Sequence, residues 1–158
     1  MQLPHWTTAR RVVKWGPMID PLYQKEILRL AGEARGAGRL AGATITLTVK
    51  NPLCGDQIRL DVLFNDKKVA DLAHETRACV LCQASASLIA TLAPGQSEAN
   101  IRQARDMVAA MLAGDTHELS GWKEYAVFTP VIDHPGRHKC VTLPLDALVK
   151  AFDRLRAR

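Results

Sequence analysis

Two segments of the chain alternate hydrophobic and polar residues with the period of two that marks a half-buried β-strand. The first covers 43–49, where Ile45, Leu47 and Val49 face one side and threonines face the other. The second covers 58–64, with apolar residues at every even position. A turn at Asn65-Asp66 leads into a less regular third strand over 68–74. Because the connections are short, the pattern predicts an antiparallel meander.

The rest of the chain has the spacing of amphipathic helices. A first helix is predicted to start at Asp20-Pro21 and to end before Gly36 and Gly38. Thr76 and Ser97 are each placed to cap a helix, the first over about 77–92 and the second ending at Gly114. Residues 115–136 show only a short helical stretch, followed by the helix-breaking residues Pro130 and Pro135, and Pro144 is expected to open a last helix. The order of elements predicts an α+β domain in which helices pack on one face of a small three-stranded antiparallel sheet.

The chain has 158 residues, a length that suits a single domain with a substantial hydrophobic core. We expect that domain to cover 19–158, after a basic N-terminal extension over 1–18 that holds Trp6 and Trp15 and no acidic residue. Three interpretations of this extension are open: an arm that docks on a partner, a loosely packed terminus, or an organellar presequence.

The net charge of +5 comes largely from basic residues near the two ends of the chain. Such a surface can attract an anionic partner, but an aromatic content of 5% and the lack of a nucleic-acid-binding motif argue against nucleic acid. No apolar run reaches the length of about 18 residues needed to span a membrane, and no secretory signal is evident. We therefore expect a cytoplasmic protein with no membrane partner, whose four cysteines are reduced and free for metal binding or catalysis.

The segment Asn51-Pro52-Leu53-Cys54-Gly55-Asp56 places a thiol and a carboxylate two residues apart on a tight turn. This pair of donors suits a borderline-soft divalent metal such as zinc or iron. Cys79 and Cys140 also fall at predicted element ends, Cys79 in the first turn of a helix and Cys140 just before one. Element ends that are distant in sequence can converge, so Cys54, Asp56, Cys79 and Cys140 would complete a tetrahedral site. The alternative for each cysteine is a small buried hydrophobic residue, and for Cys82 we favour that role.

Three motifs carry a resemblance to a known family. They are Asn-Pro-Leu-Cys-Gly-Asp around Cys54, Ala-Cys-Val-Leu-Cys-Gln-Ala-Ser-Ala-Ser from Ala78, and Arg-His-Lys-Cys-Val-Thr-Leu-Pro-Leu-Asp-Ala-Leu from Arg137. In this order they closely resemble the signatures of the U-type iron–sulfur scaffold family, which comprises the NifU N-terminal domain, IscU and SufU. The resemblance covers about 22–152. It implies that Cys54, Asp56, Cys79 and Cys140 bind zinc, or alternatively iron or a nascent 2Fe–2S cluster.

The chain is most similar to the SufU-type branch. Lys139 stands where the IscU branch has histidine before the last cysteine, and Cys79 and Cys140 are 61 positions apart, as in the longer SufU-type spacing. Arg137 matches the SufU arginine that replaces this histidine near the metal; its alternative is an ordinary surface arginine. The chain departs from the family at Ala78, where glycine is usual, and at Cys82, where the SufU branch has serine. The stretch Glu33-Ala34-Arg35-Gly36 also replaces an asparagine- and proline-rich segment.

The resemblance implies an iron–sulfur cluster assembly protein, a scaffold or sulfur-transfer protein rather than a classical enzyme. Its expected partners are a SufS-type cysteine desulfurase and downstream assembly or apo-acceptor proteins. Opening of the metal site would free Cys54 to accept persulfide sulfur, and Asp56, as the hard ligand among soft ones, would control lability. The alternative is a structural-zinc adaptor with no sulfur-transfer role. A zinc hydrolase is disfavoured because no general base accompanies the site.

Overall fold

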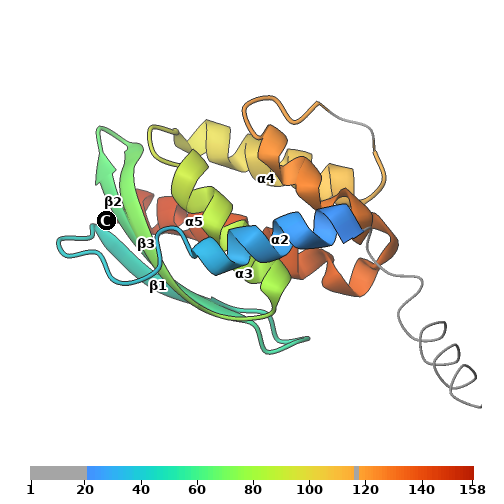
Figure 1. Cartoon of the computed structure of the whole chain (residues 1–158). Helices are drawn as coiled ribbons and strands as arrows, with labels where there is room; N and C mark the ends of the chain where they lie inside the picture. The colour runs from blue at the N-terminus through green and yellow to red at the C-terminus, as the bar shows by residue number, and fades with distance from the viewer. Residues whose placement is uncertain (1–20, 116–117) are drawn as a thin grey trace, which may run out of the picture.

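The computed structural model describes residues 21–115 and 118–158, so the predicted N-terminal extension over 1–18 lies outside the described residues. A small sheet forms one layer, and the helices form the other on one of its faces (Figure 1). This arrangement confirms the predicted α+β fold. The elements in chain order are α2 (Pro21–Glu33), β1 (Ile45–Lys50), β2 (Gln57–Asn65), β3 (Lys68–Arg77), α3 (Val80–Leu92), α4 (Glu98–Leu112), the 3₁₀ segments η1 (Lys123–Asp133) and η2 (Pro135–Arg137), and α5 (His138–Arg156).

The sheet is the predicted antiparallel meander, with strand order β1-β2-β3. Ile45, Leu47 and Val49 are buried against the helices, while the threonines between them are exposed. In register, Ile45 pairs with Val62 and Val49 with Ile58, which keeps the apolar residues of both strands on the same face. The alternation along the chain therefore selects the face of the sheet that α3 and α5 cover.

Both edges of the sheet are protected from pairing with another chain. Along β1, Arg154 and Arg158 of the C-terminal segment donate hydrogen bonds to the carbonyls of Thr46 and Thr44, at 3.2 and 3.1 Å. Along β3, the backbone N–H of His74 donates to the Gly36 carbonyl at 2.8 Å. Covered edges of this kind limit aggregation. Two of the C-terminal arginines, Arg154 and Arg158, thus serve the fold.

Two predicted helix starts are wrong. Thr76 does not cap α3, because β3 continues to Arg77 in register with β2, and the Thr76 hydroxyl is hydrogen-bonded to Nδ1 of His74 at 2.8 Å. The N-cap of α3 is Cys79. The last helix begins at His138, so Pro144 lies inside α5 and Cys140 lies in its first turn rather than before it. Proline is tolerated there at the cost of one hydrogen bond, since it has no N–H to donate to the Cys140 carbonyl four residues earlier.

The predicted start of α4 is confirmed, whereas the predicted Asp20 cap of the first helix lies outside the described residues. Ser97 caps α4, accepting a hydrogen bond from the Asn100 N–H at 3.3 Å, and the predicted apolar stripe of that helix is buried. Pro130 does not end the helical segment, because η1 continues past it to Asp133. The buried side chains of Tyr125 and Phe128 hold this 3₁₀ segment against the core.

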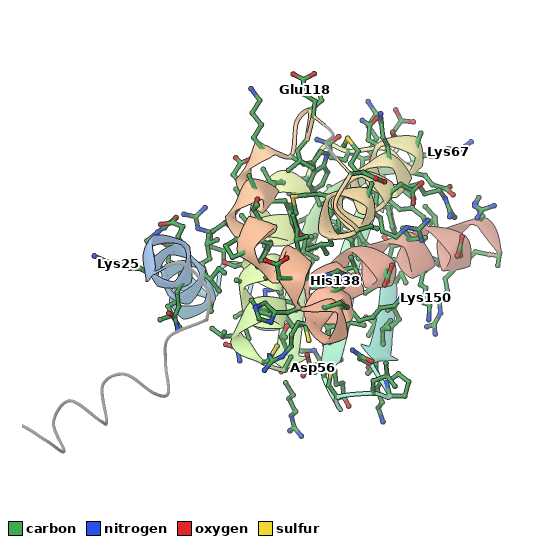
Figure 2. The ribbon with its side chains drawn as sticks, turned by 90° about the vertical axis from the view of Figure 1, so that its right-hand side faces the viewer. Lys25, Asp56, Lys67, Glu118, His138 and Lys150 are labelled. Atoms are coloured by element: carbon green, nitrogen blue, oxygen red, sulfur yellow. The ribbon has the colours of Figure 1, made fainter. Side chains whose placement is uncertain are left out.

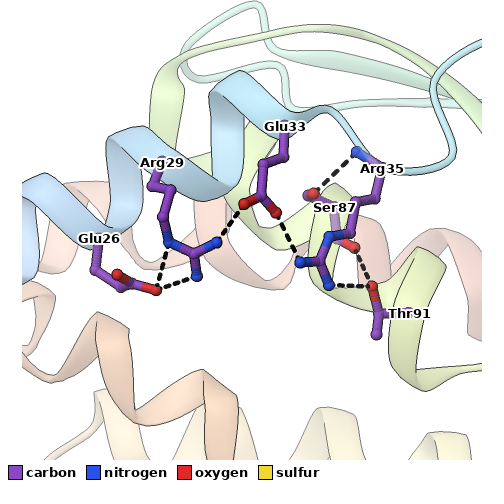
Figure 3. A network of polar contacts seen from close by, with 6 residues as sticks. All are labelled: Glu26, Arg29, Glu33, Arg35, Ser87 and Thr91. Carbon is purple, nitrogen blue, oxygen red and sulfur yellow. Dashed lines mark hydrogen bonds and ion pairs between the residues drawn. The ribbon is translucent and has the colours of Figure 1, made fainter.

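The turn after α2 is joined to α3 by a polar network (Figure 3). Arg29 pairs with Glu26 and Glu33, and Arg35 reaches Glu33 at 2.8 Å, but these pairs are exposed and contribute little to stability. The contact that orders the turn is the hydrogen bond from the Arg35 N–H to the Ser87 hydroxyl at 3.0 Å. This network includes Glu33 and Arg35, in the stretch where the chain departs from the family that it resembles.

Gly36 is required at this turn, and its replacement by alanine is expected to destabilise the protein by about 2–4 kcal/mol. Its φ is +77°, and a Cβ there would lie 2.6 Å from Cβ of Ala90 on α3. Gly42 is a matched control, because its φ is +78° with nothing within 4 Å of a built Cβ. Urea unfolding of the two variants separates the clash from the backbone strain. Equal losses in Gly36→Ala and Gly42→Ala would show that the close approach to Ala90 does not matter.

No helix in the described parts of the chain is long and apolar enough to cross a membrane.

Candidate metal and sulfur site

The turn between β1 and β2 is built by Asn51, whose backbone and side chain hold the loop closed. Its side-chain oxygen accepts a hydrogen bond from the Leu53 N–H at 3.1 Å, and its carbonyl accepts from the N–H groups of Cys54 and Gly55 at 3.3 and 2.8 Å. Gly55 has a φ of +77°, a conformation that other residues rarely adopt. The result is a hydrogen-bonded loop that exposes Cys54 and buries Asp56. The role of Asn51 was not predicted from the sequence, although an Asn-Pro pair is a signal for such a turn.

The structure brings three of the predicted ligands together. The ligand atoms of Cys54, Asp56 and Cys140 all lie within 4.8 Å of one another. Cys54 and Asp56 come from the loop, Asp56 directly before β2, and Cys140 comes from the first turn of α5. Figure 2 shows Asp56 at the end of the molecule where His138 begins α5. Residues 84 positions apart therefore converge at one end of the sheet and one helix N-terminus.

Cys79 lies beside this group without belonging to the tight cluster of three. Its backbone N–H donates to Oδ1 of Asp56 at 3.2 Å, which fixes the start of α3 against the carboxylate. As the N-cap residue, Cys79 uses its side chain in no capping hydrogen bond. Burial raises the pKa of the Cys140 thiol, and the neighbouring Cys79 and Asp56 raise it further. Cys79 therefore lies beside the cluster through its backbone contact with Asp56, and its role as the fourth ligand stays a prediction.

The second carboxylate oxygen of Asp56, Oδ2, indicates whether these residues fit a metal. Asp56 is buried, and Oδ2 has no hydrogen-bond partner in the described structure. An unpaired buried carboxylate oxygen is costly unless a cation balances it. Three thiols and one carboxylate form the donor set that zinc or iron accepts. The cluster of Cys54, Asp56 and Cys140, with Cys79 beside it, therefore fits a divalent metal.

Cys82 lies behind the site and belongs to the core, as the sequence predicted. Its exposed fraction is 0%, and burial raises the pKa of its thiol, with the charges of Asp56, Cys79 and Cys54 adding to the shift. One turn later, the Ser85 hydroxyl donates to the carbonyl of Val141 at 2.6 Å. This bond connects α3 to the start of α5, so it positions Cys79 and Cys140 relative to each other.

Two residues shortly before Cys140, His138 and Arg137, lie near the site. His138 points away from the thiols: its Nε2 lies 3.0 Å from the Val131 carbonyl and 3.2 Å from that of Ile132. Arg137 is exposed, and its guanidinium makes no hydrogen bond or ion pair within residues 21–115 and 118–158. It lines a cavity of about 240 Å³ between α2, α3 and η1. A role for Arg137 beside the metal stays a prediction.

The family model of the NifU-like N-terminal domain matches residues 22–149, a range that contains all four proposed ligands. The chain belongs to the NifU-like N-terminal domain family. This is the U-type scaffold family that the three cysteine motifs resemble.

Individual members of the NifU-like family match almost the whole domain. The iron–sulfur cluster assembly scaffold protein IscU of Streptococcus pyogenes is 31% identical over 86% of this chain and 86% of its own length. The zinc-dependent sulfurtransferase SufU of Bacillus subtilis is 29% identical over 84% of this chain and 90% of its own. The crystal structure of the N-terminal part of a nitrogen-fixing NifU-like protein from Brucella abortus superposes with a TM-score of 0.81, at 32% identity over 86% of this chain and 95% of that one.

Proposed function

We propose that this member of the NifU-like family is an iron–sulfur cluster assembly protein that accepts sulfur on Cys54. The observation that carries the proposal is the convergence of Cys54, Asp56 and Cys140 around an unpaired buried carboxylate oxygen. Cys79, beside them, supplies the fourth ligand. The metal would hold the thiols reduced and ordered until the site opens.

The exposure of the thiols supports Cys54 as the sulfur acceptor. Cys54 is exposed, whereas Cys140 and Cys82 are buried and Cys79 is half-buried. In the transfer step, the Cys54 thiolate attacks the outer sulfur of a cysteine persulfide on the desulfurase. A new S–S bond forms on Cys54, the S–S bond of the donor breaks, and the donor cysteine leaves as a thiolate. No oxidant or reductant is needed.

The SufU-type assignment rests on residues around the last cysteine. Lys139 replaces the histidine of the IscU branch, and its Nζ lies 3.9 Å from Asp146, so it is not a ligand in this arrangement. We therefore favour a zinc site that opens so that Cys54 can accept sulfur from a SufS-type cysteine desulfurase. A site that assembles a 2Fe–2S cluster for downstream apo-acceptor proteins would use the same residues.

A structural-zinc adaptor is the second candidate, and the burial of Asp56 and Cys140 favours it. In such a protein the metal only holds the fold, so removal of the metal would unfold the chain. A sulfur acceptor would instead stay folded without the metal, and the hydrophobic core built by the described α-helices, the strands and η1 supports that outcome.

Metal analysis with a visible spectrum, on protein purified without air, tests the proposal. We expect about one zinc per chain. After incubation with desulfurase, cysteine and iron, we expect faster desulfurase turnover and no colour. Iron and sulfide with charge-transfer bands in the visible would instead show a cluster scaffold. Zinc with no effect on desulfurase turnover would support the adaptor.

A further inference from the structure

A groove of about 400 Å³ runs between the end of β1, α4 and α5, next to the Cys54 loop. We call it the basic groove, after the five basic side chains that line it: Lys50, Arg102, Arg105, Lys139 and Lys150. Its lining also includes two carboxylates, Asp146 and Asp153. The groove therefore has a surplus of three positive charges.

Two of the five basic side chains have no close partner. Arg102 is paired with Glu98 and Asp153, and Arg105 with Asp106 at 3.1 Å. Lys139 reaches Asp146 only at 3.9 Å. Lys50 and Lys150 form no ion pair with any residue that the structure describes. Cations that the protein leaves unpaired along one groove attract and orient an anionic ligand.

The surroundings of the groove favour a protein segment over a small anion. Leu53 follows Pro52, a lining residue, and is 87% exposed; only Leu28 is another exposed large hydrophobic residue in the described parts of the chain. An exposed apolar side chain beside a charged groove is typical of a protein interface. Asp146 would repel a compact dianion such as phosphate, whereas an extended segment can space its carboxylates around it.

We propose that the basic groove binds an acidic segment of a partner protein, with Leu53 in apolar contact beside that segment. The groove adjoins the proposed metal site at two points. Lys50 and Pro52 belong to the segment just before Cys54, and Lys139 directly precedes Cys140. A partner held there is placed at the exposed thiol. The inference depends on the proposed function only for the reaction that the bound partner carries out.

The groove can be tested by NMR on the isotopically labelled full chain, titrated with an oligo-glutamate peptide and, separately, with inorganic phosphate. We expect the peptide to shift the amides of 49–53 and 139–150 saturably, with an affinity that falls as salt is added. The double variant Lys50→Glu/Lys150→Glu should weaken peptide binding at least about tenfold, because it replaces attraction by repulsion. Lys25→Glu is the control: Lys25 is an exposed lysine of α2, on the side of the molecule away from Lys150 (Figure 2).

Three results would overturn the inference. They are no saturable shift with the peptide, an equal loss in Lys25→Glu, or phosphate binding to the same amides as strongly as the peptide. A desulfurase assay separates this failure from failure of the proposed function. The groove variant should require more protein for half-maximal stimulation and reach the same plateau, whereas loss of sulfur acceptance removes the plateau. Peptide binding without any stimulation by the unmodified chain would leave the groove in place and disprove the proposed function.

Discussion

Replacing Cys54 with alanine is expected to abolish persulfide formation on this chain while leaving the unfolding of the metal-free protein nearly unchanged. The loop around Cys54 is held by Asn51 and Gly55, and none of its described hydrogen bonds uses the Cys54 side chain. The thiol is exposed, so its removal creates no cavity. Intact mass spectrometry after incubation with desulfurase and cysteine, without reductant, measures the gain of one sulfur atom.

Cys82→Ala is the matched control for Cys54→Ala. It removes a thiol that lies close behind the site but is fully buried. We expect it to lower stability by about 1–2 kcal/mol through the cavity it leaves, and to keep sulfur acceptance. Persulfide on Cys79 or Cys140 in the Cys54→Ala protein would contradict the assignment of Cys54. A large loss of stability in metal-free Cys54→Ala would point to the adaptor.

Replacing Asp56 with asparagine is expected to change stability and metal affinity in opposite directions. The metal-free chain should gain about 1–3 kcal/mol, because the substitution removes the charge of a buried carboxylate whose Oδ2 has no partner. Metal affinity should fall at least about tenfold, because the variant loses an anionic ligand. Urea unfolding in the presence of a chelator gives the first quantity, and competition with a chromogenic zinc chelator gives the second.

Asp61→Asn provides the matched control, since Asp61 is a buried carboxylate with its partners in place. It accepts hydrogen bonds from the Leu40 N–H at 2.9 Å and the Thr46 hydroxyl at 2.7 Å, and pairs with Arg59 at 3.2 Å. Asp61→Asn should therefore lower stability and leave metal affinity unchanged. If Asp56→Asn destabilises the metal-free chain as much as Asp61→Asn, then Asp56 serves the fold. A metal-free chain without a cooperative unfolding transition would favour the structural-zinc adaptor.

The errors in reading the sequence have a common origin. Thr76 is a good capping residue, yet β-sheet pairing extends β3 past it and places the cap at Cys79. Pro144 is a good first helical residue, yet α5 begins six residues earlier. In both cases tertiary contacts outweigh a local preference that contributes only about 1–3 kcal/mol. These shifts matter for the site, since they put Cys79 at a cap and Cys140 within a helical turn.

By itself, the sequence determined the sheet and its buried face, because alternating hydrophobic and polar residues place all the apolar side chains of a strand on one face. Its cysteine motifs also determined the family and the four proposed ligands. Only the tertiary structure decided that Cys54, Asp56 and Cys140 meet while Cys79 lies beside them, and that Oδ2 of Asp56 is left unpaired. The basic groove was likewise hidden, since Lys50 and Lys150 are 100 positions apart in the chain. Local sequence patterns indicate which residues are buried or exposed. Which distant residues come together in a site depends on how the helices and strands pack and where that packing places their ends.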